Sequence, residues 1–261
     1  MTEQAVDVTA IMLAHAEGPM AGPAFHSLLD AVAHAREAGL IVETLVLLDN
    51  PDAATAEAFG AAERYGVRVE QVSYGDHPLV RNHAAAQVSR GYIAFLDGDD
   101  LWGENWLVEA HRLCETDPGR VIAHPEVNWY FDQSTYLYFL PDQTDPEFDV
   151  YSYIRVANPW DALCMAPVAA YQDIAHIKRS LAEGFAFDDW HWNMETLVAG
   201  YVHRVAPDTI HFKRRRAGSQ FAAASANKSL PRATPIMDYE WLRQHEDSGR
   251  PHAVGDVRSA D

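Results

Sequence analysis

The sequence predicts an α/β fold in which helices flank a mostly parallel sheet. Apolar runs of strand length alternate with segments that carry apolar residues at helical spacing, and the connections between them are short. Glycines follow several predicted helices, as at Gly39 and Gly66. Because successive strand–helix–strand units form right-handed crossovers, their strands come together in parallel.

Four strands are expected in the first part of the chain, with a helix after each of the first three. The run at 8–14 is compact and apolar, which is typical of a buried parallel strand. Phe25, Leu28, Leu29 and Val32 have the spacing of one helix face. The predicted strands are 8–14, 43–48, 67–72 and 92–96, and the predicted helices are 25–38, 53–65 and 77–90.

The regular alternation ends after residue 100. Acidic and aromatic residues with two prolines fill 132–150, which indicates a hairpin followed by a loop. The other predicted strands are 121–123, 127–131, 162–166 and 201–205, and the other helices are 104–115, 171–183, 188–199 and 237–242. We expect the last dozen residues to be disordered.

Composition narrows the class of protein. With 261 residues, 48% of them hydrophobic, the chain can bury a sizeable core. The net charge of −18 argues against a nucleic-acid partner and against docking on anionic lipid. Two cysteines are too few for a disulfide framework, the first residues lack a signal-peptide pattern, and no apolar run reaches the roughly 20 residues that span a bilayer. We therefore expect a soluble, cytoplasmic protein without a transmembrane segment.

The most informative stretch is an apolar run, 92–96, that ends in Asp97, Asp99 and Asp100. Carboxylates this close repel one another unless a cation or hydrogen-bond donors offset their charge. Mg²⁺ and Mn²⁺ bind through one or two carboxylates together with substrate phosphates. One interpretation is therefore a metal–diphosphate site, and the other is an acidic turn that caps the next helix.

Other candidates also have a functional and a structural interpretation. Asp49 ends a predicted strand and either binds a nucleobase or ribose or belongs to a turn. Arg81 either binds phosphate or a base oxygen or lies on a solvated helix face. Asp188 and Asp189 begin a helix, where they supply a general base or complement the helix dipole.

The last candidates lie around the basic run at 213–216. His211 is a metal ligand, a diphosphate donor or a structural residue. The run itself, with Arg215, is a solvated segment or holds a diphosphate leaving group. The aromatic residues around Trp190 form a sugar-stacking wall or plain core.

Two segments together resemble family-2 glycosyltransferases of GT-A fold. Residues 80–84 (Val-Arg-Asn-His-Ala) and 91–100 (Gly-Tyr-Ile-Ala-Phe-Leu-Asp-Gly-Asp-Asp) are similar to the block aRN…a.GeYI.fLDaDD, with the same spacing. The segment 187–190 (Phe-Asp-Asp-Trp) resembles the family's acid pair, which is often written ED and followed by Trp. The resemblance covers roughly residues 8–219, and its specificity lies in the combination of motifs.

The resemblance implies a GT-A-type, Rossmann-like α/β fold with a smaller mixed acceptor-side region. We expect the glycosyltransferase domain over 1–220, with a nucleotide-sugar half at about 8–103 and an acceptor half at about 104–220. The tail, 221–261, is expected to be partly helical or disordered.

The activity that the resemblance implies is metal-dependent sugar transfer with inversion. The donor would be a UDP-, GDP- or dTDP-sugar, the cofactor Mn²⁺ or Mg²⁺, and the acceptor a hydroxyl of a glycan, a lipid-linked molecule or a small molecule. Asp189 would be the catalytic base with Asp188 in support, and Asp99 and His211 would bind the metal. Trp190 and Trp160 would contact the acceptor.

The remaining expected contacts are with the nucleotide sugar. Asp97 would contact the ribose, Asp49 the base, and Asp100 the cation or the sugar. The loops 14–17 and 49–52 differ from the family's usual Pro-Thr-Tyr-Asn and Asp-Asp-Gly-Ser, so the donor stays open. The full set of expected donor-binding residues is Ala14, Glu17, Asp49, Arg81, Asp97, Gly98, Asp100 and Arg215.

Two other functions are compatible with the sequence. In a phosphatase of the haloacid-dehalogenase type, Asp97 would be the nucleophile and Asp99 the acid–base, with Lys178 as a phosphate clamp. That motif expects Thr or Val where Leu101 stands. A non-catalytic GT-A domain that binds nucleotide sugar or glycan is the second alternative, although all the acids are present. A homodimer is one assembly that the sequence permits.

Overall fold

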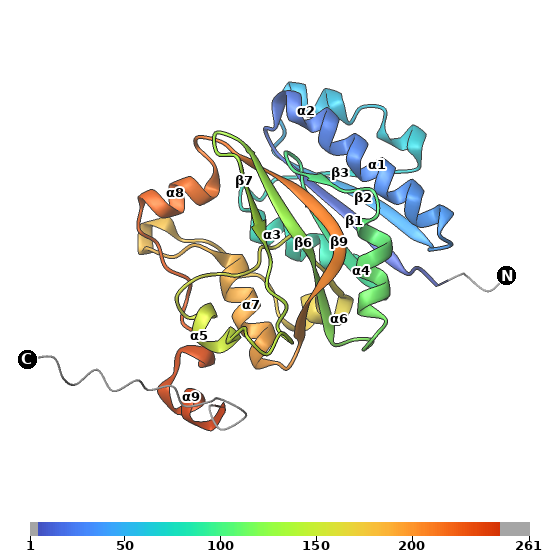
Figure 1. Ribbon diagram of the computed structural model, residues 1–261. Helices are drawn as coiled ribbons and strands as arrows, with labels where there is room; N and C mark the ends of the chain where they lie inside the picture. The colour runs from blue at the N-terminus through green and yellow to red at the C-terminus, as the bar shows by residue number, and fades with distance from the viewer. Residues whose placement is uncertain (1–4, 246–261) are drawn as a thin grey trace, which may run out of the picture.

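The computed structural model describes residues 5–245 (Figure 1). The first part of the chain alternates between strands and helices, as predicted. Its elements are β1 (Val8–Ala14), η1 (Gly18–Met20), α1 (Ala21–Glu37), β2 (Val42–Asp49), α2 (Ala53–Ala58), η2 (Ala62–Tyr65), β3 (Arg68–Val72), α3 (His77–Ala85), β4 (Tyr92–Asp97) and β5 (Leu101–Trp102).

The second part contains two long strands and several short helices. Its elements are α4 (Trp106–Cys114), β6 (Val121–Asp132), β7 (Tyr136–Phe139), α5 (Val150–Ile154), β8 (Met165–Pro167), α6 (Val168–Asp173), η3 (Leu181–Glu183), α7 (Asp188–Val198), β9 (Val202–Arg215), α8 (Gln220–Ala226), η4 (Pro235–Met237) and α9 (Tyr239–His245).

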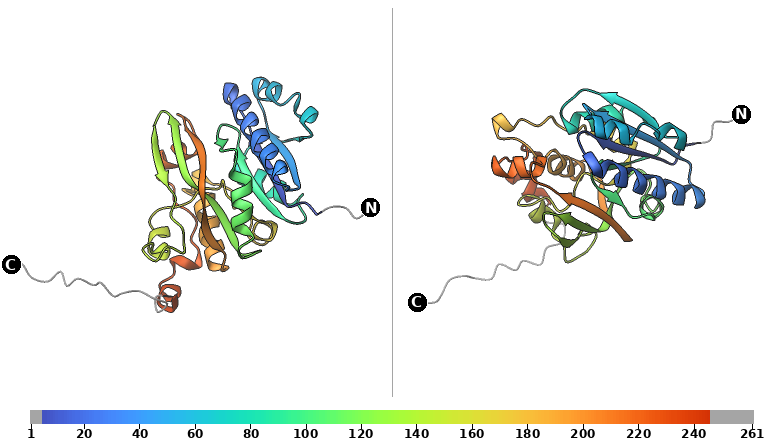
Figure 2. Two further views of the ribbon diagram at one scale, coloured as in Figure 1. Left: turned by 45° about the vertical axis from the view of Figure 1, so that its right-hand side comes forward. Right: turned by 90° about the horizontal axis from the view of Figure 1, so that it is seen from above.

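The described strands form one nine-stranded sheet in the order β3-β2-β1-β4-β8-β6-β9-β5, with β7 beside β6. Strands β1 to β4 are parallel, whereas β8 runs antiparallel to both β4 and β6. Helix α1 packs with α4 and α3 packs with α6, and the two pairs cover opposite faces of the sheet (Figure 1). The sheet curls, so that β6, β7 and β9 stand at an angle to β1–β3 (Figure 2).

Strand register brings the predicted site residues to one edge. Strand β1 lies between β2 and β4, and Leu13 is paired with Asp97 while Ala14 is paired with Leu48. Strand β5 follows the acidic loop directly and pairs with β9, with Leu101 opposite Phe212. This pairing holds the acidic loop beside the basic end of β9.

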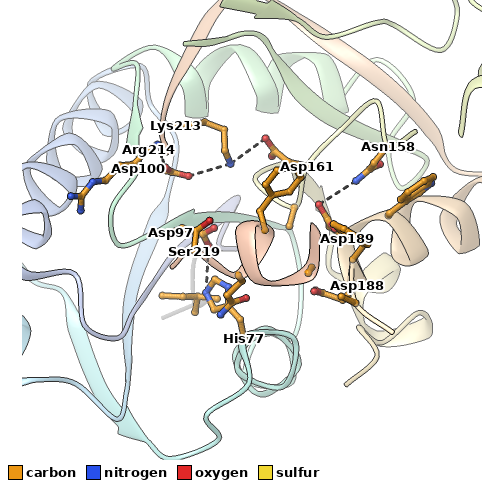
Figure 3. A pocket seen from close by; sticks show the side chains of 18 of the residues that line it. His77, Asp97, Asp100, Asn158, Asp161, Asp188, Asp189, Lys213, Arg214 and Ser219 are labelled. Carbon is orange, nitrogen blue, oxygen red and sulfur yellow. Dashed lines mark hydrogen bonds and ion pairs between the residues drawn. The ribbon is translucent and has the colours of Figure 1, made fainter. Parts of the chain in front are cut away.

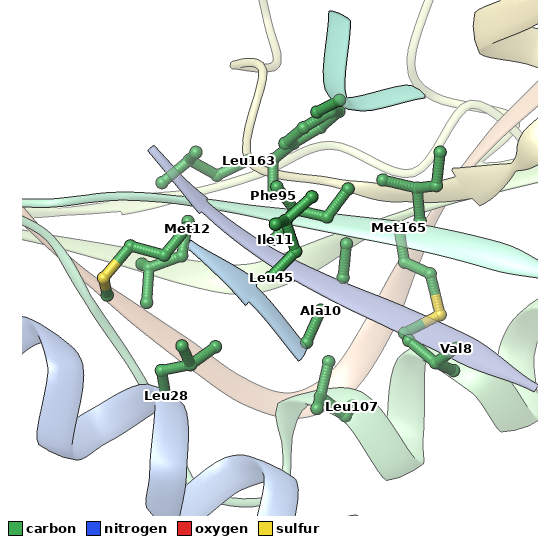
Figure 4. Packing of buried hydrophobic residues seen from close by; sticks show 14 of the residues in the cluster. Val8, Ala10, Ile11, Met12, Leu28, Leu45, Phe95, Leu107, Leu163 and Met165 are labelled. Atoms are coloured by element: carbon green, nitrogen blue, oxygen red, sulfur yellow. The ribbon is translucent and has the colours of Figure 1, made fainter. Parts of the chain in front are cut away.

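The main core lies between the sheet and its helices. Ile11, Met12, Phe95 and Leu28 are each at most 5% exposed, and they belong to one cluster that extends from β1 to β8 (Figure 4). At about 25 cal/mol per Å² of buried apolar surface, such a cluster is the main source of stability. A smaller cluster, around Ile154 and Met194, packs α5, α7 and η4 together.

One predicted pair of strands is a single long strand, and another predicted strand is longer than expected. Residues 121–123 and 127–131 both belong to β6, which shifts register between Pro125 and Val127. Proline has no backbone N–H to donate to the ladder, and the strand accommodates Pro125 as an irregularity. The strand predicted at 201–205 begins one residue later and continues into the basic run as β9, which ends at Arg215.

Several predicted helices are shorter than expected. The helix at 53–65 is divided into α2 and η2 near Gly60. The helix at 171–183 ends at Asp173, because the chain turns to bond with α3. There Asn82 donates to the His176 carbonyl at 2.7 Å and accepts from the His176 N–H at 2.8 Å.

The C-terminal expectations have different outcomes. The predicted short helix at 237–242 corresponds to η4 and α9. The expected disorder of the last dozen residues lies outside the described residues. Within residues 5–245, no helix has both the length and the apolar character that crossing a bilayer requires.

We predict that Gly91→Ala lowers the free energy of unfolding by about 3 kcal/mol or more, because it combines backbone strain with a clash. Gly91 has φ +78°, and an added Cβ would lie 2.6 Å from the Asp7 carbonyl oxygen. Urea denaturation measures the change. Gly119→Ala is the control, since Gly119 has φ +81° and open space around it. It should cost only about 1 kcal/mol, and equal losses would contradict the role of the Asp7 contact.

Candidate active site

A cavity of about 710 Å³ opens at the carboxyl edge of the parallel strands (Figure 3). The acids after β4, the start of α7 and the basic end of β9 all contribute to its wall. Ligands of open α/β sheets bind at this edge. The structure thus brings the acidic stretch, the acid pair and the basic run to one cavity.

Asp97 lies at the end of β4 and faces α3. Its Oδ1 accepts a hydrogen bond from Arg81 Nη2 at 2.8 Å and lies 3.5 Å from His77 Nε2. The other Arg81 nitrogen, Nη1, is 3.7 Å from Asp188 Oδ2. Although burial acts to raise it, the charge of Arg81 brings the pKa of Asp97 below its usual value. Arg81 is itself buried, so it is a fixed cation between the two groups of acids.

Asp100 belongs to a buried bridge of charges. Its Oδ2 lies 3.1 Å from Lys213 Nζ, and the same Nζ is 3.1 Å from Asp161 Oδ2 (Figure 3). The Arg214 N–H donates to the other Asp100 oxygen at 2.7 Å. Burial raises the pKa of Asp100 to about 7 against the effect of Lys213. For Asp161, burial is outweighed by Lys213, and the pKa falls to about 2.

Asp99 pairs with a more exposed cation. Its Oδ2 accepts from Arg216 Nε at 2.8 Å, and Arg216 Nη2 is 3.2 Å from Glu17 Oε2. Burial and then the charge of Asp99 raise the pKa of Glu17 to about 7. The Arg216 side chain is 36% exposed, so it can move away from Asp99 at a lower cost than a buried group.

The donor set fits a metal ion that is shared with a phosphate ligand. Among residues 5–245, no group of three or more His, Cys, Asp or Glu side chains converges to hold an ion alone. Magnesium sites that serve nucleotides need only one or two carboxylates, because phosphates and water complete the shell. Asp99 meets this requirement, because it lies on the cavity wall and, within residues 5–245, its salt bridge is with the partly exposed Arg216.

The acid pair at the start of α7 is divided between two environments. Phe187, just before it, has φ 59°, a strained conformation for a non-glycine residue that sets the direction of the helix start. Asp188 Oδ2 is 3.4 Å from His176 Nδ1, and His176 and Arg81 lower the pKa of Asp188 although burial opposes them. Asp189 instead accepts a hydrogen bond from Asn158 Nδ2 at 3.2 Å.

Asp189 is buried as well, but its pKa is raised where that of Asp188 is lowered. Burial and then the charge of Asp188 raise the pKa of Asp189 to about 7. Two neighbouring carboxyls whose pKa values are pushed apart are typical of an acid–base site. Asp188 is therefore suited to a fixed negative charge, and Asp189 to proton transfer near neutral pH.

Asp49 and Ala14 line the cavity at the ends of β2 and β1. Asp49 Oδ1 accepts from the N–H groups of Tyr74 and Gly75, at 2.7 Å and 3.1 Å, which fixes the loop after β3. Gly98 is not on the cavity wall. A Cβ at Gly98 would lie 2.7 Å from the Ala14 Cβ, so glycine lets the acidic loop pack on β1.

Arg215, Trp190 and Trp160 also line the cavity. The Arg215 guanidinium lies 4.1 Å from the ring centroid of Tyr130, which is a cation–π contact. Trp190 donates from Nε1 to the Ile154 carbonyl at 2.6 Å. Trp160 is only 2% exposed and stacks on His203 at 4.2 Å, so most of its ring is committed to the interior.

The structure does not bring His211 to the cavity. It is fully buried, its ring lies 4.5 Å from that of Trp106, and both of its ring nitrogens lack a hydrogen-bond partner. Burial lowers the pKa of His211 to about 3, so the ring is neutral. Its role as a metal ligand stays a prediction.

Sequence analysis did not predict the roles of Asn158, Asp161, His77 and His176. Asn158 and Asp161 lie in the same short loop, Asn-Pro-Trp-Asp, which has the composition of a turn. Only the packing of that loop between α7 and β9 shows that Asn158 faces Asp189 and that Asp161 faces Lys213. The polar residues of this turn were the one available signal.

A scan against protein-family models finds no match, and a search of curated proteins finds none. Solved structures do match. S. aureus TarS 1-349 in complex with UDP-GlcNAc has a TM-score of 0.57 and 15% identity over 92% of this chain. Mannosyltransferase PcManGT from Pyrobaculum calidifontis, in complex with GDP-Man and Mn2+, has a TM-score of 0.57 and 14% identity over 92% of this chain.

The fold is the GT-A fold of glycosyltransferases. The predicted fold class and the resemblance to GT-A enzymes are thereby confirmed at the level of architecture. The chain spans 65% of the TarS 1-349 chain and 44% of a longer TarS chain, which it matches with a TM-score of 0.58. At this identity the likeness concerns the GT-A fold and not the residues of the site.

We predict that Lys213→Met destabilises the protein by about 3–5 kcal/mol, because it leaves Asp100 and Asp161 buried without their cation. Urea denaturation at neutral pH measures the loss, and Lys213→Arg should recover part of it. Arg112→Met, which breaks the exposed pair with Glu109, is the control and should cost less than about 1 kcal/mol. Similar losses in both Met variants would contradict the importance of the buried bridge.

Proposed function

We propose that the chain is a metal-dependent glycosyltransferase. It transfers a sugar from a UDP-, GDP- or dTDP-sugar to an acceptor hydroxyl, with inversion at the anomeric carbon. One observation carries the proposal. The paired acids of the acidic loop and a separate carboxyl, that of Asp189, line the same cavity of a GT-A fold, and the pKa of Asp189 is about 7. The GT-A neighbours solved with UDP-GlcNAc and with GDP-Man support a nucleotide-sugar donor.

On the donor side, the chain offers both hydrogen-bond acceptors and cations. We propose that Asp97 contacts the ribose and Asp49 the base. Arg81 would bind a phosphate or a base oxygen, and Arg215 would bind the diphosphate. Ala14, Glu17, Gly98 and Asp100 complete this side as wall or support of the cavity. Charge-assisted bonds from guanidinium groups are the strong contacts for a diphosphate.

A divalent cation would be held by Asp99 together with the diphosphate, and His211 is its more remote candidate ligand. When bound, Mn²⁺ or Mg²⁺ offsets the charge that develops on the departing nucleoside diphosphate. Lys213 adds a buried positive charge on the same side, and Arg216 adds a partly exposed one. The Mn2+ in the solved mannosyltransferase supports a divalent cation in general terms.

On the acceptor side, Asp189 would accept the proton of the attacking hydroxyl. Asp188 stays ionised beside Arg81 and His176. Its negative charge favours protonation of Asp189, so the proton of the acceptor hydroxyl goes to Asp189. A single base suffices when the hydroxyl attacks from the face opposite the diphosphate, and such a displacement inverts the anomeric carbon.

We assign the acceptor contact to Trp190 and Trp160, which line the cavity, Trp160 through the small exposed part of its side chain. A glycan, a lipid-linked acceptor or a small molecule is compatible with these rings. The nucleotide-sugar half is assigned to residues 8–103 and the acceptor half to residues 104–220. Both cysteines are free and buried, which suits the reducing cytoplasm that we propose as the location.

We predict that Asp189→Asn lowers sugar transfer by about a hundredfold to ten-thousandfold, the usual contribution of a general base. Binding of the nucleotide sugar, measured by calorimetry, should stay within about threefold, because the amide keeps the shape of the side chain. The wild-type rate should rise with pH through the pKa of Asp189, about 7, because only the ionised carboxylate accepts a proton.

The donor for this assay comes from a thermal-shift screen of nucleotide sugars with and without Mn²⁺. Asp173→Asn, at the end of α6 and away from the cavity wall, is the matched control and should leave transfer unchanged. Loss of donor binding by a folded Asp189→Asn protein would contradict the assignment of the base.

We predict that Arg216→Gln strengthens the binding of Mn²⁺ alone, because it frees the Asp99 carboxylate, and weakens the binding of a nucleoside diphosphate by about tenfold. Calorimetry with Mn²⁺ alone and with UDP or GDP measures both effects. Arg204→Gln, which breaks a partly exposed pair with Asp142, should change neither affinity. Unchanged Mn²⁺ binding in Arg216→Gln would contradict Asp99 as a metal ligand.

The same assays separate the two alternatives. A phosphatase that uses Asp97 as its nucleophile would release inorganic phosphate from phosphate esters, which a glycosyltransferase does not do. A non-catalytic domain would bind the nucleotide sugar without metal-dependent release of nucleoside diphosphate. The pairing of Asp97 with buried Arg81 favours binding over nucleophilic attack, because the cation holds the carboxylate in place.

A further inference from the structure

A chain of side-chain amides leads from the interior to Asp189. Asn193, one helical turn after Asp189 on α7, is fully buried. Its Nδ2 lies 3.3 Å from the Trp160 carbonyl oxygen and 3.0 Å from Asn158 Oδ1. Asn158 Nδ2 in turn lies 3.2 Å from Asp189 Oδ2 (Figure 3).

The direction of this chain follows from its fixed end. A backbone carbonyl only accepts hydrogen bonds, so the Asn193 atom that faces Trp160 is the NH₂ group. That NH₂ group also donates to Asn158, so the Asn158 atom it meets is the amide oxygen. The NH₂ group of Asn158 therefore points to Asp189 and donates to its carboxylate.

We propose that Asn158, held in this orientation by Asn193, is a positioning residue for the Asp189 carboxylate. It directs that carboxylate into the cavity and favours its ionised form. The inference rests on the proposed function, because it presumes that Asp189 is the base of the transfer reaction. Nothing in the motifs of the chain assigns a role to either asparagine.

The charges around Asp189 make this hydrogen bond important. Asp188 from the same helix and Asp161 from the facing loop both disfavour a second negative charge, and so does burial. The backbone N–H of Trp190 and the charge of Arg81, from α3, favour the ionised form of Asp189. Asn158 adds a neutral donor, which favours the charged form without adding a charge of its own.

The loop of Asn158 also reaches the donor side. Asp161, three residues later, accepts from Asn128 Nδ2 at 2.9 Å and pairs with Lys213, which holds Asp100. One short loop therefore contacts the proposed base at one end and the cation of the diphosphate side at the other. A shift of this loop would move both groups together.

The test compares Asn158→Ala, which removes the donor, with Asn158→Asp, which keeps the shape but replaces the donor with a second carboxyl. In both variants the acid limb of kcat/KM should move to higher pH, by about one unit in Asn158→Ala and further in Asn158→Asp. Asn193→Ala should move it in the same direction by less, because Asn158 stays but its amide is free to rotate. Donor affinity should stay within about twofold.

Asn105→Ala is the matched control, since Asn105 donates to the Asp208 carbonyl at 3.0 Å on the surface. It should leave the pH profile unchanged. Glu17 and Asp100 also have pKa values of about 7, so a second readout must isolate Asp189. Carboxyl-carbon NMR of the full chain does this, with the Asp189 signal assigned by its loss in Asp189→Asn.

The NMR titration separates this inference from the proposed function. A pKa of Asp189 that is higher in folded Asn158→Ala than in the wild type supports the positioning role, even if no donor is ever transferred. An unchanged pKa of Asp189 in both Asn158 variants overturns it, even if the protein proves to be a glycosyltransferase. A raised pKa in Asn105→Ala would overturn it as well.

Discussion

The site depends on one constraint, which is that acids gathered at a half-buried sheet edge must have cations beside them. Burying an ionised carboxylate without a partner costs several kcal/mol. Three cations meet this need: Arg81 between Asp97 and Asp188, Lys213 between Asp100 and Asp161, and Arg216 between Asp99 and Glu17. Each cation joins two segments of the chain that are distant in sequence, so the same ion pairs hold the cavity wall together.

These pairs differ in burial, and the difference has a chemical meaning. Arg81 and Lys213 are buried and fixed, whereas Arg216 is partly exposed and lies where a diphosphate or a cation would compete with it. Within residues 5–245, Asp189 forms no salt bridge and accepts a hydrogen bond from the Asn158 amide. Burial and the charge of Asp188 outweigh Arg81 and the backbone N–H of Trp190, so the pKa of Asp189 rises to about 7, whereas the pKa of Asp188, beside His176 and Arg81, falls. The distribution of cations thus distinguishes a proton acceptor from its supporting acid.

The fold was largely predictable, because hydrophobic periodicity fixes which segments are strands and helices. The runs at β1 and β4 and the helix at α1 came from apolar spacing alone, and the GT-A architecture agrees with them at only 14–15% identity to solved structures. Long-range contacts decided the rest. The two strands expected at 121–123 and 127–131 are one strand, β6, because it pairs with β9 on both sides of Pro125. The helix expected from Tyr171 ends early, because Asn82 bonds to His176.

The sequence by itself determined the alternation of strands and helices and the positions of Asp97, Asp99, Asp100 and Asp189 at element ends, since these follow from local patterns. Only the tertiary structure decided what each polar side chain meets. It brought the loop of Asn158 to the acid pair and β9 to the acidic loop, and it kept His211 away from the cavity. The physical reason is that hydrogen bonds and ion pairs form between segments far apart in the chain, and no local pattern encodes their distance.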